Sequence, residues 1–211
     1  MSKIEELSSA VIRGKTKLVP GLVEECLAEG CAPMDILNTG MIDAMSVVGE
    51  KFKNNEIFVP EMLIAARAMK KGVEVLKPHL GDASASSAGK VVIGTVAGDL
   101  HDIGKNLVAL MIESAGFEVV DLGVDVPAAK FVEAVENDPA VSIVCVSALL
   151  TTTMPAMKET VEALKACSAI DRIKIMVGGA PITQAFADEI GADYYTADAA
   201  SASQVAKSIV A

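Results

Sequence analysis

The chain has 211 residues, which suffices for one large domain or two modest ones. Its formal net charge of −10 offers no basic stripe to a phosphate backbone, which argues against nucleic acid as a partner. Hydrophobic residues make up 52% of the sequence, yet no apolar run approaches the roughly 18 residues of a membrane-spanning helix. Because the N-terminus also lacks a signal pattern, we expect a cytoplasmic protein with no membrane partner.

Residues 1–80 are predicted to form a four-helix bundle, because only helical periodicity occurs there and the connections are short. Residues that commonly begin or end helices mark the boundaries: a Ser2–Glu5 capping box, Pro20, Pro33 and Pro60 at starts, Gly14 and Gly30 at ends. The third helix carries a methionine-rich apolar face whose default role is bundle core: Met34, Leu37, Met41, Met45 and Val48.

A flexible linker is predicted at 81–89, where Gly, Ala and Ser predominate. From 90 to 211, strands and helices alternate, which indicates an α/β domain. The strands are expected at about 90–96, 118–122, 142–147, 173–177 and 193–196, and the helices near 103–115, 127–137, 154–166, 181–189 and 199–209. Five βα units predict a flavodoxin-like (Rossmann-type) parallel sheet with helices on both faces and strand order 2-1-3-4-5.

In that order, the ligand crevice lies between the first and third strands, at their carboxyl ends. A hexad directly follows the first strand: Asp99-Leu100-His101-Asp102-Ile103-Gly104. A loop histidine with a carboxylate two residues away suits a metal ligand whose second nitrogen is held by that carboxylate. The alternative is a polar strand-to-helix loop with a solvent-facing histidine.

Two further motifs are expected at the same edge of the sheet. The third strand ends in Ser147-Ala148-Leu149, followed by threonines 151 to 153, and the fourth ends in Gly178-Gly179. The glycines let a ligand lie against the backbone. Neither the phosphate loop with its Lys-Ser/Thr ending nor the dinucleotide Gly-x-Gly-x-x-Gly pattern follows the first strand, which sets both nucleotide interpretations aside.

The hexad, Ser147-x-Leu149 and Gly178-Gly179 together resemble the cobalamin-binding fingerprint of base-off, histidine-on corrinoid proteins. With a helical bundle in front, the chain is similar to the corrinoid subunits of methyltransferase systems for methanol, methylamines, glycine betaine or aryl methyl ethers. The same pair of modules occurs in cobalamin-dependent methionine synthase. The resemblance implies that His101 is the lower axial ligand of cobalt, in place of the cofactor's own dimethylbenzimidazole.

The resemblance also implies a channel for the displaced nucleotide tail, bordered by Ser147, Leu149, Gly178 and Gly179. Beside that analogy, the residues themselves predict further roles. Asp99 is placed to accept a hydrogen bond from the second imidazole nitrogen, and Thr153, or else Thr151, is placed to bond to Asp99 and complete a proton relay.

Three more expectations concern the surroundings of the cofactor. Asp102 is expected to cap the following helix or to face the corrin amides, and Gly104 to permit a tight entry into that helix. A cover over reactive cobalt excludes water and oxygen, so we expect Met41, Met45 or Val48 of the bundle to cap the upper corrin face.

The function implied is that of a methyl carrier, a non-catalytic subunit that cycles between Co(I) and methyl-Co(III). The partners implied are a substrate-specific methyltransferase, an acceptor methyltransferase that uses tetrahydrofolate or a thiol, and a reductive activase. One alternative is the cobalamin subunit of an adenosylcobalamin mutase, which usually lacks such a helical cap. Another is a cobalamin-based sensor, which needs a basic helix-turn-helix segment that this sequence does not show.

Overall fold

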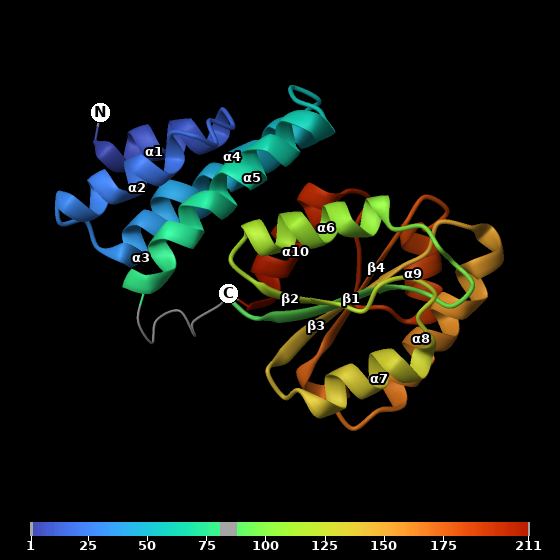
Figure 1. The fold of residues 1–211 in the computed structure, drawn as a ribbon. Coiled ribbons are helices and arrows are strands. Elements are labelled where there is room, and N and C mark those ends of the chain that lie inside the picture. Colours follow the sequence, from blue (N-terminus) through green and yellow to red (C-terminus); the bar gives the residue numbers. More distant parts are fainter. Residues whose placement is uncertain (1, 81–87, 211) are drawn as a thin grey trace. The chain divides into compact units, whose positions relative to one another are not determined.

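The computed structural model describes residues 2–80 and 88–210. These form two compact units, a helical one and an α/β one, and each is described by itself (Figure 1). Residues 81–87 of the predicted linker lie outside the described residues. Within the described ranges, no helix is both long enough and apolar enough to cross a membrane.

The helical unit follows the predicted order of four helices, of which the third is divided into segments. Ser2 and Glu5 form the predicted capping box, since the serine hydroxyl accepts from Glu5 N at 3.2 Å and Ser2 N donates to the Glu5 carboxylate at 2.7 Å. The elements are α1 (Lys3–Ile12), α2 (Val19–Ala28), α3 (Pro33–Asp35), the π-helical η1 (Ile36–Ile42), α4 (Asp43–Lys53), α5 (Val59–Leu76) and the 3₁₀ turn η2 (Lys77–His79).

The π-helical segment η1 was not predicted, and it changes which side chains of the third helix are buried. Ile36 and Met41 are both buried, five residues apart, whereas Leu37 is only partly buried. A π-helix bonds residue i to i+5, so it keeps residues at that spacing on one face, which an α-helix does not. Met45 and Val48 of α4 continue the buried face at α-helical spacing.

The α/β unit contains one parallel sheet in the order β2-β1-β3-β4-β5, which confirms the predicted order. The strands are β1 (Lys90–Thr95), β2 (Glu118–Asp121), β3 (Val141–Ser147), β4 (Lys174–Gly178) and β5 (Tyr194–Tyr195). The helices and 3₁₀ turns are α6 (Ile103–Ser114), α7 (Ala128–Asn137), η4 (Thr151–Thr153), α8 (Met154–Ala166), η5 (Ile170–Arg172), α9 (Gln184–Ile190) and α10 (Ala199–Val210).

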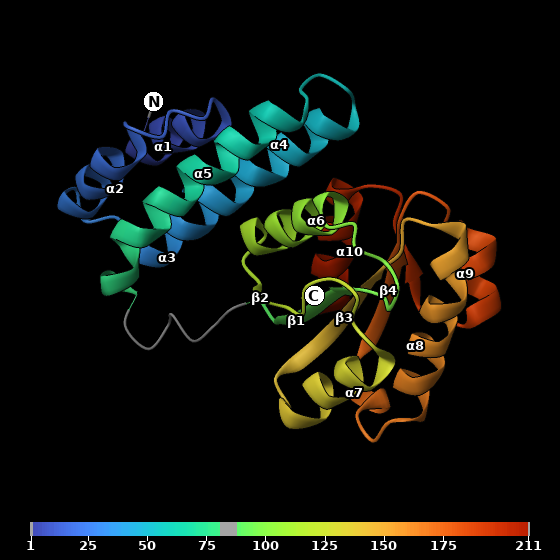
Figure 2. The same ribbon diagram turned by 45° about the vertical axis from the view of Figure 1, so that its right-hand side comes forward.

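Helices cover both faces of this sheet, as predicted: α6 and α10 lie on one face, and α7 and α8 on the other (Figures 1 and 2). The helix expected from residue 181 begins instead at Gln184, because the Thr183 hydroxyl caps it by accepting from Phe186 N at 3.2 Å.

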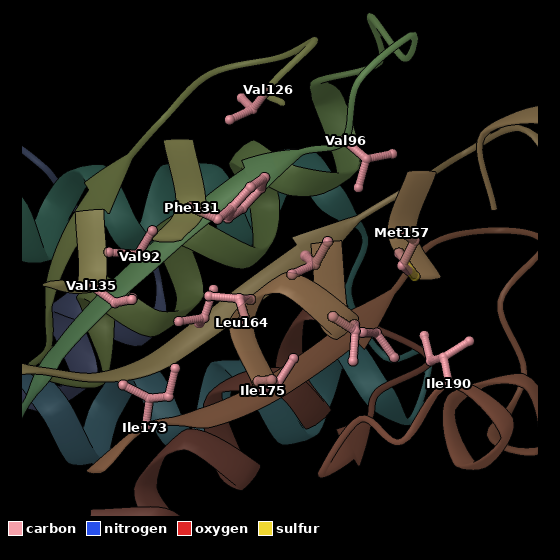
Figure 3. Packing of buried hydrophobic residues seen from close by; sticks show 14 of the residues in the cluster. Val92, Val96, Val126, Phe131, Val135, Met157, Leu164, Ile173, Ile175 and Ile190 are labelled. Atoms are coloured by element: carbon pink, nitrogen blue, oxygen red, sulfur yellow. The ribbon is translucent and has the colours of Figure 1, made fainter. Parts of the chain in front are cut away.

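The core on the α7 and α8 side holds the sheet and helices in place. Phe131 and Leu164 are fully buried there against strand residues such as Val92 and Ile175 (Figure 3). A Cβ on Gly94 of β1 would come within 2.7 Å of the Phe131 ring, so the glycine lets that ring pack directly on the strand. This packing makes β1 a rigid support for the loop that follows it.

Candidate functional site

The predicted hexad loop, Asp99–Gly104, follows β1 at the carboxyl edge of the sheet and leads into α6. The loop between β2 and α7 supports its start, because Asp125 N donates to the Asp99 carbonyl at 2.9 Å. In return, Gly98 N donates to the Asp125 carboxylate at 2.7 Å. Gly98 and Asp125 both have left-handed backbone conformations, with φ of 79° and 53°. Two loops therefore fix the position of Asp99 through reciprocal bonds.

The Asp99 carboxylate is completely buried and is the centre of a hydrogen-bond network. Its Oδ1 accepts from His101 Nδ1 at 2.7 Å and from His101 N at 3.1 Å. Its Oδ2 accepts from the backbone N–H groups of Leu149 at 2.7 Å and Leu150 at 3.3 Å, and from the Thr153 hydroxyl at 2.8 Å. The network joins the hexad loop to the loop after β3, which are the two loops expected to flank the ligand crevice.

These bonds keep Asp99 ionised. Burial by itself would raise the pKa of the Asp99 carboxyl, because it removes water from the charged form. The hydrogen bonds from Leu149 N, from the His101 imidazole and backbone, and from the Thr153 hydroxyl outweigh burial and hold that pKa well below its usual range. An ionised carboxylate has no proton to donate, so Nδ1 of His101 must carry the proton of the Asp99–His101 bond.

A neutral His101 imidazole with its proton on Nδ1 has a free lone pair on Nε2. The His101 side chain is 49% exposed, and among the described residues only Asp99 bonds to its ring. A neutral imidazole whose Nδ1–H is held by a carboxylate is the usual arrangement of a histidine that binds metal through Nε2. The bond from Thr153 to Asp99 that we predicted is present, whereas Thr151 is an exposed residue of η4.

Large aliphatic residues of the two loops that Asp99 joins are exposed. Leu100 and Ile103, on either side of His101 in the chain, are 73% and 81% exposed. Leu149 and Leu150, whose N–H groups reach Asp99, are also exposed. Large aliphatic side chains gathered on a surface around one polar group are typical of a binding site for a large, partly apolar ligand.

The other predicted motif residues lie at the same edge of the sheet. Ser147 is aligned with Gly178 in the pairing of β3 with β4. A Cβ on Gly179, which has φ of 134°, would lie 1.8 Å from the Ala148 carbonyl oxygen, and one on Gly178 would lie 3.0 Å from the Thr196 carbonyl oxygen. Gly179 is therefore required by the close approach of neighbouring backbone, and a Cβ on Gly178 would make a tight contact there. The contact of both glycines with a ligand stays a prediction.

Our conformational reason for Gly104 was wrong. Gly104 lies within α6 and has no left-handed φ, and a Cβ placed on it meets nothing within 4 Å. The helix therefore begins without needing a glycine, and the missing side chain leaves open space beside the hexad loop. Asp102 is exposed, and its carboxylate accepts from the Asn106 side chain at 3.2 Å rather than from a backbone N–H. Its expected role toward the corrin amides stays a prediction.

Met45 lies on α4 of the helical unit, where it is 2% exposed. The expectation that it caps the upper corrin face stays a prediction.

Sequence reasoning missed two buried polar residues near the site. Thr95, the last residue of β1, donates its hydroxyl to the His101 carbonyl at 2.9 Å. Lys105 of α6 is only 3% exposed, and its ammonium bonds to Asn106 at 2.7 Å and to Asp121 at the end of β2. A threonine closing an apolar strand and a lysine in a helix are both common, so no pattern in the sequence marked them.

The donor set restricts the kind of metal that His101 can bind. Among the residues that the structure describes, no three His, Cys, Asp or Glu side chains are grouped so that they could hold a metal ion. A metal bound at His101 must therefore bring most of its ligands with it, as a metal in a macrocycle does. A single imidazole, an apolar rim and open space at Gly104 fit such a group.

Comparison with known proteins points to the same kind of ligand. The model of the B12 binding domain matches residues 89–204, and a second B12 binding domain model matches residues 3–77. The chain is 44% identical to dimethylamine corrinoid protein 1 of Methanosarcina acetivorans, over 99% of this chain and 97% of the relative.

Solved structures agree over the full chain. A cobalamin-binding protein from Desulfitobacterium hafniense matches with a TM-score of 0.84 and 30% identity, covering 100% of both chains. A chain of the methanol:cobalamin methyltransferase complex from Methanosarcina barkeri matches with a TM-score of 0.84 and 31% identity, covering 99% of this chain and 79% of that one. The chain therefore belongs to the family of B12-binding corrinoid proteins, and its cofactor is a cobalamin.

Proposed function

We propose that this chain is a methyl carrier that binds cobalamin base-off, with His101 Nε2 as the lower axial ligand of cobalt. The observation that carries the proposal is the imidazole itself, whose Nδ1–H is held at 2.7 Å by a buried, ionised carboxylate, while Nε2 has no hydrogen-bond partner in the described part of the chain. When bound, the cofactor supplies a cobalt centre that accepts a methyl group as Co(I) and releases it from methyl-Co(III).

In this proposal, Asp99, supported by Thr153, holds the proton of the His101 imidazole on Nδ1. Asp99 keeps the proton on Nδ1, which directs the lone pair of Nε2 to the metal. With Nε2 bound to the metal, the Asp99 carboxylate would hold the ring in one tautomer and one orientation. The Thr153 hydroxyl, at 2.8 Å from Asp99, supports the carboxylate from the side opposite the histidine.

Met45 and the rest of the bundle have a proposed role as well. We assign residues 1–80 as the cap domain, 81–89 as the linker and 90–211 as the cobalamin-binding domain. The cap would exclude water and oxygen from the upper face of the cofactor until a partner binds.

The partners follow from the relatives, which are named as corrinoid proteins for dimethylamine and as part of a methanol:cobalamin methyltransferase complex. By analogy, this chain works with a substrate-specific methyltransferase, an acceptor methyltransferase that uses tetrahydrofolate or a thiol, and a reductive activase. It is the methyl-carrying subunit and not itself the catalyst. Its match to methyltransferase corrinoid proteins along the whole chain favours this role over that of a mutase subunit or a sensor.

The test is reconstitution of the protein with hydroxocobalamin in the absence of oxygen, using protein labelled with 15N-histidine. After one-electron chemical reduction to the Co(II) state, electron paramagnetic resonance should show hyperfine coupling to a 15N nucleus, which only a histidine of the protein supplies. The His101→Ala variant should lose that coupling and show a shifted visible spectrum. Coupling to 14N alone would mean that the cofactor keeps its own base and would contradict histidine-on binding.

The carrier function needs a second readout. After reduction and treatment with methyl iodide, the wild type should hold a stable methyl group on cobalt and should lose it to an acceptor methyltransferase. If the methylated protein forms but no such enzyme demethylates it, the carrier proposal is contradicted while histidine ligation stands.

A further inference from the structure

We propose that Thr95 is a positioning residue for His101, one that favours axial ligation by holding the backbone of the histidine from β1. Thr95 is fully buried, and its hydroxyl donates to the His101 carbonyl at 2.9 Å. It lies outside the hexad loop and outside the other motifs that carry the resemblance. The inference rests on the proposed role of His101 as cobalt ligand.

The support that Thr95 offers is rigid. Its backbone N–H donates to the Gly123 carbonyl at 3.0 Å, and its carbonyl accepts from Val126 N at 2.9 Å. Within the sheet, Thr95 is paired with Ser147 of β3. Because its side chain is also β-branched and restricted about χ1, the hydroxyl has a well-defined direction.

Thr95 and Asp99 hold His101 by separate routes. Asp99 bonds to the ring and to the N–H of His101, and is itself held by the loop after β3. Thr95 bonds to the carbonyl of His101 from β1. Both peptide groups of the histidine are therefore fixed, while its ring remains 49% exposed for a ligand. The bond from Nδ1 to Asp99 also restricts rotation of the ring, so Nε2 has a defined direction.

Packing alone does not explain a threonine at this position. A valine has the same shape, suits a buried strand better and carries no polar atom to desolvate. The hydroxyl of Thr95 is satisfied by the His101 carbonyl, which is its one hydrogen-bond acceptor within the described part of the chain. The hydroxyl therefore stabilises the hexad loop, by bonding to it, rather than the sheet.

The first test uses the protein without cofactor and measures amide hydrogen exchange in Thr95→Val and Thr95→Ser. In Thr95→Val, the amides of His101 and Asp102 should exchange about three- to tenfold faster, as expected for the loss of one hydrogen bond. In Thr95→Ser, which keeps the hydroxyl, they should stay close to the wild type. If Thr95→Val instead lowers the stability of the whole α/β unit, the amides of β1 and β3 should be accelerated by the same factor as those of His101 and Asp102. That result would overturn the proposal.

Thr160→Val is the matched control. Thr160 is also buried, and its hydroxyl donates to a carbonyl, that of Ala156 in α8, at 2.8 Å. Its replacement removes a comparable bond away from the site and should leave exchange at His101 unchanged.

The second test measures the ratio of histidine-off to histidine-on cobalamin by paramagnetic resonance of the 15N-histidine-labelled Co(II) protein. The ratio should rise about three- to tenfold in Thr95→Val and not in Thr95→Ser or Thr160→Val. The inference would be overturned if Thr95→Val and the wild type have the same histidine-off to histidine-on ratio and the same amide exchange. If Thr95→Val does not fold, Thr95→Ala takes its place. Absence of 15N coupling in the wild type would refute the proposed function instead, and the exchange measurement would still decide whether Thr95 holds His101.

Discussion

At the scale of single residues, the site depends on one carboxylate with no exposure to solvent. Asp99 satisfies five donors with two oxygens, and these donors come from two loops about 50 positions apart in the chain. The cost of burying the charge is offset by these bonds, which also decide the tautomer of His101.

Asp99→Asn should disable His101 as a ligand while preserving the shape of the site. The amide has one accepting oxygen and one donating nitrogen, so it cannot accept on both sides as the carboxylate does. If the oxygen serves Leu149 and Thr153, the amide nitrogen faces Nδ1 and drives the proton to Nε2. We expect histidine ligation about ten- to a hundredfold weaker, measured as the histidine-on fraction in the labelled Co(II) protein. An unchanged fraction would contradict the tautomer argument.

Asp99 should also make the stability of the cofactor-free protein depend on pH. Its pKa is lower in the folded state than in the unfolded state, so it stabilises the fold above the unfolded value of about 4, and this contribution is lost as the pH falls toward the folded pKa. The free energy of unfolding from urea titrations should therefore fall below about pH 4. The fall should be shallower in Asp99→Asn, and equal slopes would contradict the assignment.

At the scale of elements, the buried lysine of α6 connects that helix to the edge of the sheet. Lys105 bonds to Asp121, which also accepts from Gly123 N at 2.8 Å, and Gly123 in turn accepts from Thr95 N at 3.0 Å. A continuous set of bonds therefore runs from the first turn of α6 through the end of β2 to the end of β1. It holds both ends of the segment that contains the hexad loop.

Lys105→Met should lower the free energy of unfolding by about 1–3 kcal/mol, because it removes the hydrogen bonds that a charged group, itself only 3% exposed, makes to Asp121 and Asn106. The control is Lys130→Met, which removes an ion pair with Glu133. The side chains of Lys130 and Glu133 are 63% and 54% exposed. Exposed pairs contribute little, so we expect a change below about 0.5 kcal/mol there. Equal effects in urea unfolding would mean that burial does not strengthen the Lys105 pair.

Two glycines should respond in opposite ways to the same substitution. Gly104→Ala should leave stability unchanged or raise it by about 0.5–1 kcal/mol, since alanine is the better helix former and the space is open. Gly179→Ala should destabilise strongly, because its Cβ would overlap the Ala148 carbonyl. If the cofactor occupies the space at Gly104, the first variant should also bind hydroxocobalamin more weakly; unchanged affinity would show that the space is unused.

At the scale of the whole molecule, the cysteines report on the two units separately, because the four of them are free and differ in burial. Burial raises the pKa of the Cys145 thiol in β3 to about 12, and that of Cys26 in α2 to about 11. Cys31 is only partly buried. Alkylation under native conditions therefore distinguishes opening of the α/β unit from opening of the helical unit.

Cys31 should be alkylated first and Cys145 last, as read by mass spectrometry of the digested protein. Hydroxocobalamin should slow the labelling of Cys145 further, because a ligand that binds only the folded α/β unit stabilises it by mass action. The slowing should be smaller in His101→Ala. Equal labelling of Cys145 with and without the cofactor would contradict binding at the carboxyl edge of this sheet.

The sequence by itself determined the order of elements, the strand order and the place of the hexad, because hydrophobic periodicity and right-handed crossovers leave few arrangements of five βα units. It also marked His101, Asp99 and Thr153 as residues of one site. Only the tertiary structure decided which threonine reaches Asp99, how Thr95 and Lys105 are engaged, and why Gly179 is required. These depend on distances between segments far apart in the chain and on burial, and a linear pattern carries neither. The π-helical segment at Ile36–Ile42 was likewise found only in the structure, because the apolar residues of that segment also fit α-helical spacing.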